Sequence, residues 1–122
     1  MRFHAPAGGD GEVYVLIDDA RVHVVVSGAV GEHMSLALSL ATVDAVRAAR
    51  ELDVHARHLT SLDDVGLQFL AELVARVPGR PRLLDPSVEL LESLVAAGVC
   101  GAFEVVHRDH LPPGATERGS IG

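Results

Sequence analysis

The feature that most constrains the fold is a repeated change in the spacing of apolar residues. Runs rich in β-branched residues, typical of strands, give way to segments in which apolar residues recur every three or four positions, as on one face of a helix. Between residues 12 and 106 this pattern predicts the order β-β-α-β-α-β-α-β. Strands that alternate with helices favour a mainly parallel sheet with right-handed crossovers, and the opening pair of strands adds an antiparallel edge.

The predicted elements are placed by these runs and by the turn residues between them. Gly28 and Gly31 bracket a loop after the second strand. The third helix starts at Ser87 and ends at Gly98. The strands are expected at 12–17, 21–27, 52–59, 80–84 and 102–106, and the first two helices at 35–50 and 65–77.

Each predicted helix carries one apolar stripe, which is most simply the face that packs against the sheet. An exposed part of the first stripe would instead serve a partner or a second copy of the chain. The stripes are Leu36, Leu40, Val43 and Val46 in the first helix, Leu67, Leu70, Val74 and Val77 in the second, and Val88, Leu91 and Val95 in the third.

The two ends of the chain lack a periodic pattern. Residues 1–11 hold one proline and three glycines, and residues 107–122 hold two prolines and three glycines. We therefore expect a flexible lead-in at 1–11, one domain at 12–106 and a flexible tail at 107–122. The single cysteine, Cys100, excludes a disulfide within the chain and favours a reducing compartment.

The charge of the chain excludes several classes of partner. The formal net charge is −7, and all ten basic residues are arginine. An acidic chain of this kind is not expected to bind nucleic acid or anionic membrane surfaces. We find neither a secretory signal nor a run of roughly 18 apolar residues, so we expect a cytoplasmic protein without membrane insertion. The lysine-free composition hints at a GC-rich bacterial genome.

Residues 59–67, with the sequence LTSLDDVGL, resemble the signature of STAS domains, the family of anti-sigma factor antagonists and sulfate-transporter tails. That signature is a strand, an Asp-Ser-Ser-Gly or similar turn, and an apolar helix. Asp63 matches the family aspartate, Gly66 matches the family glycine, and Leu67 begins the matching helix. Asp64 stands where the phosphorylatable serine usually is.

Two other segments are similar to the same family. Residues 23–28, HVVVSG, look like its second strand, and residues 83–106 look like its last strand–helix–strand unit. The chain departs from the family in having no acidic residue after Gly28 and in having His55 where an aspartate is usual. The resemblance implies an α/β STAS-like single domain, with a mixed sheet of four to five strands and three to four helices packed mainly on one face.

The resemblance also implies a function. In the family, a serine kinase that is itself an anti-sigma factor phosphorylates the serine, and the added charge of about −1.5 to −2 breaks docking on that kinase. The chain is therefore expected to be a non-enzymatic regulator that docks on an anti-sigma factor or serine-kinase-like partner and controls the availability of a sigma factor. The implied partner-binding loop is Asp63, Asp64, Val65, Gly66 and Leu67, with a second loop at Gly28, Gly31 and His33.

Several interpretations stay open at this stage. Asp64 either mimics the phosphorylated serine or abolishes regulation, and one of Asp63 and Asp64 is expected to cap the following helix. Ser61 is a candidate for a displaced phospho-acceptor, although the family register puts it on the approach strand. The alternative functions are an accessory subunit that braces the ATPase of a lipid-transporting ATP-binding-cassette system, and a module that self-associates as a homodimer.

The sequence offers little support for catalysis or for a metal. His58, Ser61 and Asp63 have the residue types of a triad, but no nucleophile elbow or oxyanion nest lies near them. His55 and His58 are three apart on a predicted strand and should face opposite sides of the sheet. We therefore expect no enzymatic activity, no cofactor and no metal.

Overall fold

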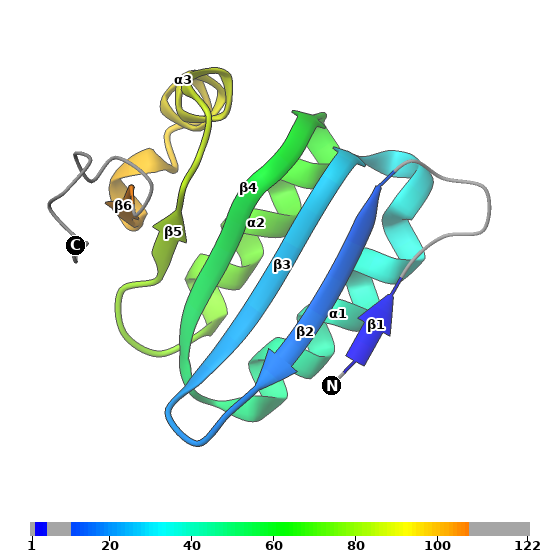
Figure 1. Cartoon of the computed structure of the whole chain (residues 1–122), viewed down its shortest axis with the longest axis vertical. Helices are drawn as coiled ribbons and strands as arrows, with labels where there is room; N and C mark the ends of the chain where they lie inside the picture. Colours follow the sequence, from blue (N-terminus) through cyan, green and yellow to red (C-terminus); the bar gives the residue numbers. More distant parts are fainter. Residues whose placement is uncertain (1, 5–10, 108–122) are drawn as a thin grey trace, which may run out of the picture.

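The strands of the sheet follow one another in chain order. In the computed structural model, which describes residues 2–4 and 11–107, the order across the sheet is β1-β2-β3-β4-β5-β6 (Figure 1). The first three strands are antiparallel, and the last four are parallel. The strands are β1 (Arg2–His4), β2 (Glu12–Ile17), β3 (Arg21–Val30), β4 (Glu51–Leu62), β5 (Arg82–Leu84) and β6 (Glu104–Val106). The helices are α1 (Ser35–Ala48), α2 (Asp64–Arg76) and α3 (Val88–Ala96), with short 3-10 turns η1 (Glu32–Met34) and η2 (Cys100–Ala102).

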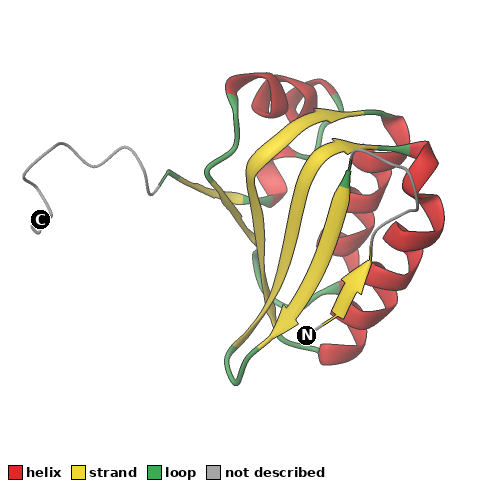
Figure 2. Ribbon diagram, turned by 45° about the vertical axis from the view of Figure 1, so that its right-hand side comes forward, coloured by secondary structure: helices red, strands yellow, loops and turns green. Residues whose placement is uncertain are grey.

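This order leaves one face of the sheet without a helix. Right-handed crossovers that advance in one direction place their helices on the same side of the sheet. Figures 1 and 2 show α1 and α2 side by side against one face, while no helix covers the other face of β2, β3 and β4. The expected α/β class, with helices mainly on one face, is confirmed. We call the uncovered side the open face.

The sheet has one strand more than the expected four to five. The extra strand is β1, which pairs antiparallel with β2 and comes from the segment 1–11 that we expected to be a flexible lead-in. Residues 1, 5–10 and 108–122 lie outside the described residues, and so does nearly all of the expected tail at 107–122.

Alternating valines form the centre of the core. Successive side chains of a strand point to opposite faces, so every second residue of β2 and β3 meets the helices. The core face of these strands is at most 2% exposed and continues into β4. Its members are Val13, Val15, Val22, Val24, Val26, Leu52 and Val54.

Helix α1 is rotated relative to the prediction. Leu36, Leu40 and Val43 of the expected core stripe are 74%, 47% and 46% exposed. The buried residues are instead Ala37, Leu38, Ala41, Thr42 and Ala45. Small side chains allow the helix to approach the sheet closely, and a prediction that weighs only large apolar residues misses an alanine face.

The other two helices differ in how well they fit their predicted stripes. In α2, Leu70 and Val77 are buried as predicted, while Leu67 and Val74 are partly buried against the core. In α3 the predicted stripe is confirmed only at Leu91, which is partly buried against the core. Val88 and Val95 are 68% and 65% exposed, and the buried residues are Leu90 and Leu94.

Strands β3 and β4 are longer than predicted and contain a bulge. The loop expected from Gly28 to Gly31 is mostly strand, since β3 continues through Gly28, which has a φ of 70°, to Val30. Val25 pairs with His55 and Ser27 with His58, so β4 uses one extra residue here. Paired residues share a face, so His55 and His58 lie on the same face, and the predicted opposite orientation was wrong.

Candidate functional site

Asp63 is the N-cap of α2. It has extended backbone angles, and its Oδ1 accepts hydrogen bonds from the backbone N–H groups of Val65 at 2.9 Å and Gly66 at 3.1 Å. These two groups belong to the first turn of the helix, where N–H groups have no partner within the helix. Of the two candidate aspartates, Asp63 therefore performs the capping, and Asp64 is the first residue of the helix.

The same carboxylate ties α2 to the loop that precedes α1. Its Oδ2 accepts a hydrogen bond from the Glu32 N–H at 3.0 Å, while the Asp63 N–H donates to the Val30 carbonyl at 3.3 Å. A Cβ at Gly31 would collide with this carboxylate, so the close approach of the two segments needs glycine there. The pKa of Asp63 is lowered, first by the hydrogen bond from Glu32 and then by those from Gly66 and Val65.

The predicted loop residues therefore gather at one end of the sheet. We call Gly31, Glu32, His33 and Asp63–Leu67 the switch loop region. His33 is exposed and lies near enough to Asp63 to help lower its pKa. Gly66 is buried, and a Cβ there would lie 3.0 Å from the Val30 carbonyl oxygen, so glycine lets α2 start directly against β3. Gly28 does not join this region, because it lies within β3, opposite Leu59.

Asp64 is presented to solvent. It is exposed, and within the described residues its carboxylate makes no hydrogen bond or ion pair. It stands in the first turn of α2, where the partial positive charge of the helix end favours an anion. Because Asp63 accepts the N–H groups of Val65 and Gly66, Asp64 is not the N-cap of α2.

Two hollows lie close to the switch loop region. One, of about 360 Å³, runs between α1 and α2 and is lined by Ser35, Ser39, Thr42, Val65, Phe69 and other residues of these helices. The other, of about 230 Å³, lies between the end of β4 and α3 and includes the exposed Ser61. Both open beside residues that the sequence assigned to partner binding or phosphorylation.

The triad residue types are not assembled. All hydrogen bonds to the Asp63 carboxylate come from backbone N–H groups. Within residues 2–4 and 11–107, no hydrogen bond joins Asp63 to His58 or Ser61. The arrangement at the switch loop region is that of an exposed loop with a surface charge, held by the hydrogen bonds of Asp63.

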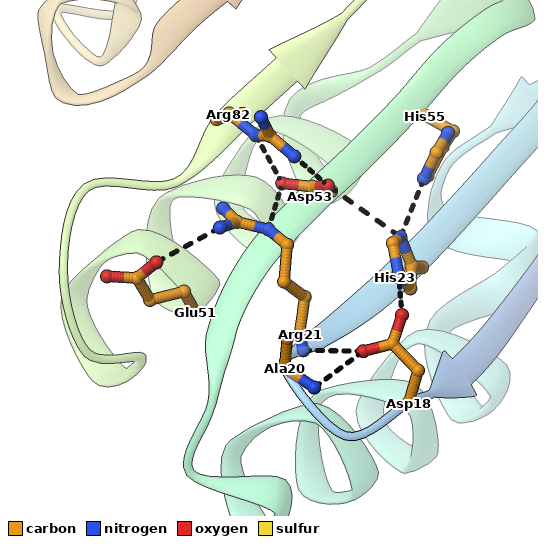
Figure 3. Close-up of polar contacts among 8 residues, drawn as sticks. All are labelled: Asp18, Ala20, Arg21, His23, Glu51, Asp53, His55 and Arg82. Atoms are coloured by element: carbon orange, nitrogen blue, oxygen red, sulfur yellow. Dashed lines mark hydrogen bonds and ion pairs between the residues drawn. The ribbon is translucent and has the colours of Figure 1, made fainter.

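A second polar cluster, on the open face, was not predicted as a site (Figure 3). Asp53, which is 2% exposed, accepts hydrogen bonds from Arg21 and Arg82 at 2.7–2.8 Å. Burial acts to raise the pKa of Asp53, but the hydrogen bonds from Arg82 and Arg21 outweigh it and the pKa is lowered. His23 bridges Asp18 at 2.9 Å and His55 at 3.0 Å.

The sequence contained a signal for this cluster. Arg21 and His23 are two apart on one strand, and Asp53 and His55 are two apart on the next, so all four side chains fall on one face once the strands pair. The pairing of His23 with Asp53 is, however, a long-range contact that no local pattern predicts.

None of the helices in the described part of the chain has the length and apolar content needed to cross a bilayer, the longest having 14 residues.

Solved structures of the protein SpoIIAA have the same fold as this chain. The unphosphorylated form of this anti-sigma factor antagonist aligns with a TM-score of 0.60 and 18% identity, over 87% of this chain and 94% of that chain. The phosphorylated form of SpoIIAA, which is described as a Bacillus cell fate determinant, aligns with a TM-score of 0.56 and 19% identity, over 80% of this chain and 93% of that chain. Searches with family models and among curated proteins find no match. The predicted STAS fold is confirmed.

Proposed function

We propose that this chain is a non-enzymatic, cytoplasmic regulator of transcription that docks on an anti-sigma factor or serine-kinase-like protein. Docking through the switch loop region would set the availability of a sigma factor. The observation that carries this proposal is the exposed carboxylate of Asp64 at the first turn of α2, which makes no hydrogen bond or ion pair within the described residues and lies beside the loop that Asp63 fixes by hydrogen bonds. A rigid loop binds with less loss of conformational entropy than a mobile one.

The fold supports an anti-sigma factor or serine-kinase-like protein as the kind of partner. Two solved structures that share it are forms of the anti-sigma factor antagonist SpoIIAA, one unphosphorylated and one phosphorylated. The resemblance aligns Asp64 with the phosphorylated serine of that family. A carboxylate at this position carries a fixed charge of −1, smaller than the charge of about −1.5 to −2 of a phosphoserine. We therefore propose that docking of this chain is not controlled by phosphorylation at residue 64.

The docking surface continues beyond the loop. The hollow between α1 and α2 starts at Val65, and the exposed apolar residues Leu36, Leu40 and Val43 lie on the neighbouring helix. Exposed apolar side chains beside a charged loop fit a protein partner, because an interface combines a buried apolar centre with a polar rim.

The test is a pull-down from a lysate of the source cells, with tagged wild type, Asp64→Ser and a matched control. Glu89→Ser is the control, because Glu89 is also an exposed acidic residue in the first turn of a helix. We expect a serine-kinase-like anti-sigma factor to be captured, in an amount that changes with Asp64→Ser and not with Glu89→Ser.

Two outcomes would overturn the proposal. Capture of a transporter ATPase that is indifferent to residue 64 would assign the chain to the accessory-subunit class. Capture of the same kinase-like partner in equal amounts by wild type and both variants would mean that Asp64 does not contribute to docking. Asp64→Ser leaves the Asp63 cap in place and removes only the interaction with the helix end, worth about 0.3–1 kcal/mol. Glu89→Ser removes an equivalent interaction, so a change in capture that is specific to Asp64→Ser reports on docking.

A further inference from the structure

We propose that His23, His55 and Asp53 on the open face form a binding site for a borderline divalent cation of the zinc class. The three side chains come from adjacent parallel strands, with His23 paired directly with Asp53 and His55 two residues further along β4. One ligand atom of each, His23 Nδ1, His55 Nε2 and an Asp53 carboxylate oxygen, lies within 4.8 Å of the others.

The distances suit tetrahedral coordination. With metal–ligand bonds of about 2.0–2.1 Å, two ligand atoms of a tetrahedral zinc site lie about 3.4 Å apart. His23 Nδ1 is 3.0 Å from His55 Nε2 and 3.8 Å from Asp53 Oδ2, two separations that bracket that value, and the third pair, His55 Nε2 and an Asp53 carboxylate oxygen, lies within 4.8 Å. Three protein ligands would leave the fourth position to water, on a side of the sheet that no helix covers.

A second carboxylate orients the central histidine. Asp18 Oδ2 lies 2.9 Å from His23 Nε2, and Asp18 Oδ1 accepts hydrogen bonds from the N–H groups of Ala20 at 2.8 Å and Arg21 at 2.7 Å (Figure 3). With the proton on Nε2, donated to Asp18, the lone pair of Nδ1 points toward His55 and Asp53. A carboxylate behind a histidine is the usual arrangement around a metal, because it fixes the tautomer and the ring.

The arginines set the strength of the site. Arg21 and Arg82 each donate a hydrogen bond to Asp53 Oδ1 at 2.8 Å, and Arg82 donates a second one to Asp53 Oδ2 at 2.7 Å. A carboxylate oxygen has two acceptor positions, so Oδ2 retains one for a cation. The positive charges weaken cation binding, but the carboxylates of Asp18, Glu51 and Asp53 outnumber the two guanidinium groups. Two imidazoles in the ligand set favour zinc, cobalt, nickel or copper over magnesium or calcium.

Cation binding would replace the hydrogen bond between His23 and His55 with bonds from both imidazoles to the metal. In the metal-free protein the two imidazoles share a hydrogen bond between His23 Nδ1 and His55 Nε2. The cation takes a lone pair from each of the two nitrogens, so His55 changes tautomer: its proton leaves Nε2 and Nδ1 of the same ring carries one instead, which keeps the imidazole neutral. The histidines are thereby locked in one arrangement that joins β3 to β4.

The test uses the untagged full chain, freed of metal with a chelator. Titration with Co²⁺ is followed by its absorption in the visible range, and titration with Zn²⁺ by calorimetry. We expect one saturable equivalent, intense tetrahedral cobalt bands, and a loss of affinity of at least tenfold in His55→Gln. His33→Gln is the matched control, because His33 is exposed and lies in η1 beyond the end of β3, whereas His23 lies near the start of that strand, and this variant should bind as wild type does.

The histidine nitrogens provide a test that needs no variant. In ¹⁵N spectra of the wild type, Zn²⁺ should shift His23 Nδ1 and His55 Nε2 and leave His33 unchanged. Absence of saturable binding, octahedral cobalt bands alone, or shifts confined to histidines outside the cluster would overturn the proposal. If His55→Gln fails to fold, the ¹⁵N spectra alone decide.

Discussion

The rotation of α1 can be tested with two leucines that lie two residues apart. Leu38 is 3% exposed and Leu36 is 74% exposed, whereas the sequence pattern placed Leu36 in the core. The perturbation is Leu→Ala at each position, which removes the same atoms from the same helix. The difference between the two losses of stability then reports which side of α1 faces the sheet.

The expected magnitudes follow from burial. Truncation of a buried leucine costs about 2–5 kcal/mol, of which part is the cavity left behind. Leu38 borders the open hollow between α1 and α2, which reduces the cavity term, so we expect about 2–3 kcal/mol. Leu36 buries only a quarter of its surface, which corresponds to about 0.4–0.7 kcal/mol, and the better helix propensity of alanine offsets some of that loss.

The assay is urea unfolding followed by circular dichroism, at two protein concentrations. The reasoning is refuted if Leu36→Ala loses as much stability as Leu38→Ala at both concentrations. A loss at Leu36 that grows with protein concentration has a different meaning, because it would place Leu36 in an interface between copies of the chain.

Three further predictions concern the switch loop region. The pKa of Asp63 is lowered in the folded state, so its charge stabilises the fold above the unfolded pKa of about 3.9 and this contribution is lost as the pH falls through the folded pKa. The difference in Tm between wild type and Asp63→Asn should therefore be present at pH 7 and shrink in a pH series below about 4. Gly31→Ala should lower the Tm, because its Cβ would displace the Asp63 carboxylate, whereas Gly101→Ala, with open space around it, should leave the Tm unchanged. Gly66→Ala should cost about 1–3 kcal/mol in urea unfolding, since its Cβ would meet the Leu62 side chain and the Val30 carbonyl; a wild-type midpoint would contradict this account.

Local patterns predicted the elements better than the faces they bury. Strand β2 has the predicted bounds, because a run of β-branched and other apolar residues from Val13 to Ile17 is followed directly by a turn at Asp18. The buried faces that the sequence predicted for α1 and α3 differ from those in the structure. In α1 the buried side is largely alanine, and the sequence does not reveal how closely a helix approaches a sheet.

The candidate site shows the same division. The N-cap of α2 could be narrowed to Asp63 or Asp64 from the sequence, because both residues suit a helix start. The choice between them depends on the Glu32 N–H, which reaches Asp63 from a loop 31 residues earlier in the chain. The pairing of His23 with Asp53 across two strands is equally non-local, so the open-face cluster required the strand register.

The chain-ordered sheet has a consequence for how the protein is made. Each strand pairs with strands next to it in the sequence, so no pairing waits for a segment that is synthesised much later. Contacts of short sequence separation form at low entropic cost, and domains assemble from the N-terminus during synthesis. The hairpin of β2 and β3 can form first, and β4 then joins it over a long ladder. β5 and β6 are added last, through ladders of three residue pairs each. We expect these strands, and β1 with its equally short ladder, to open in hydrogen exchange before the long β3–β4 ladder does.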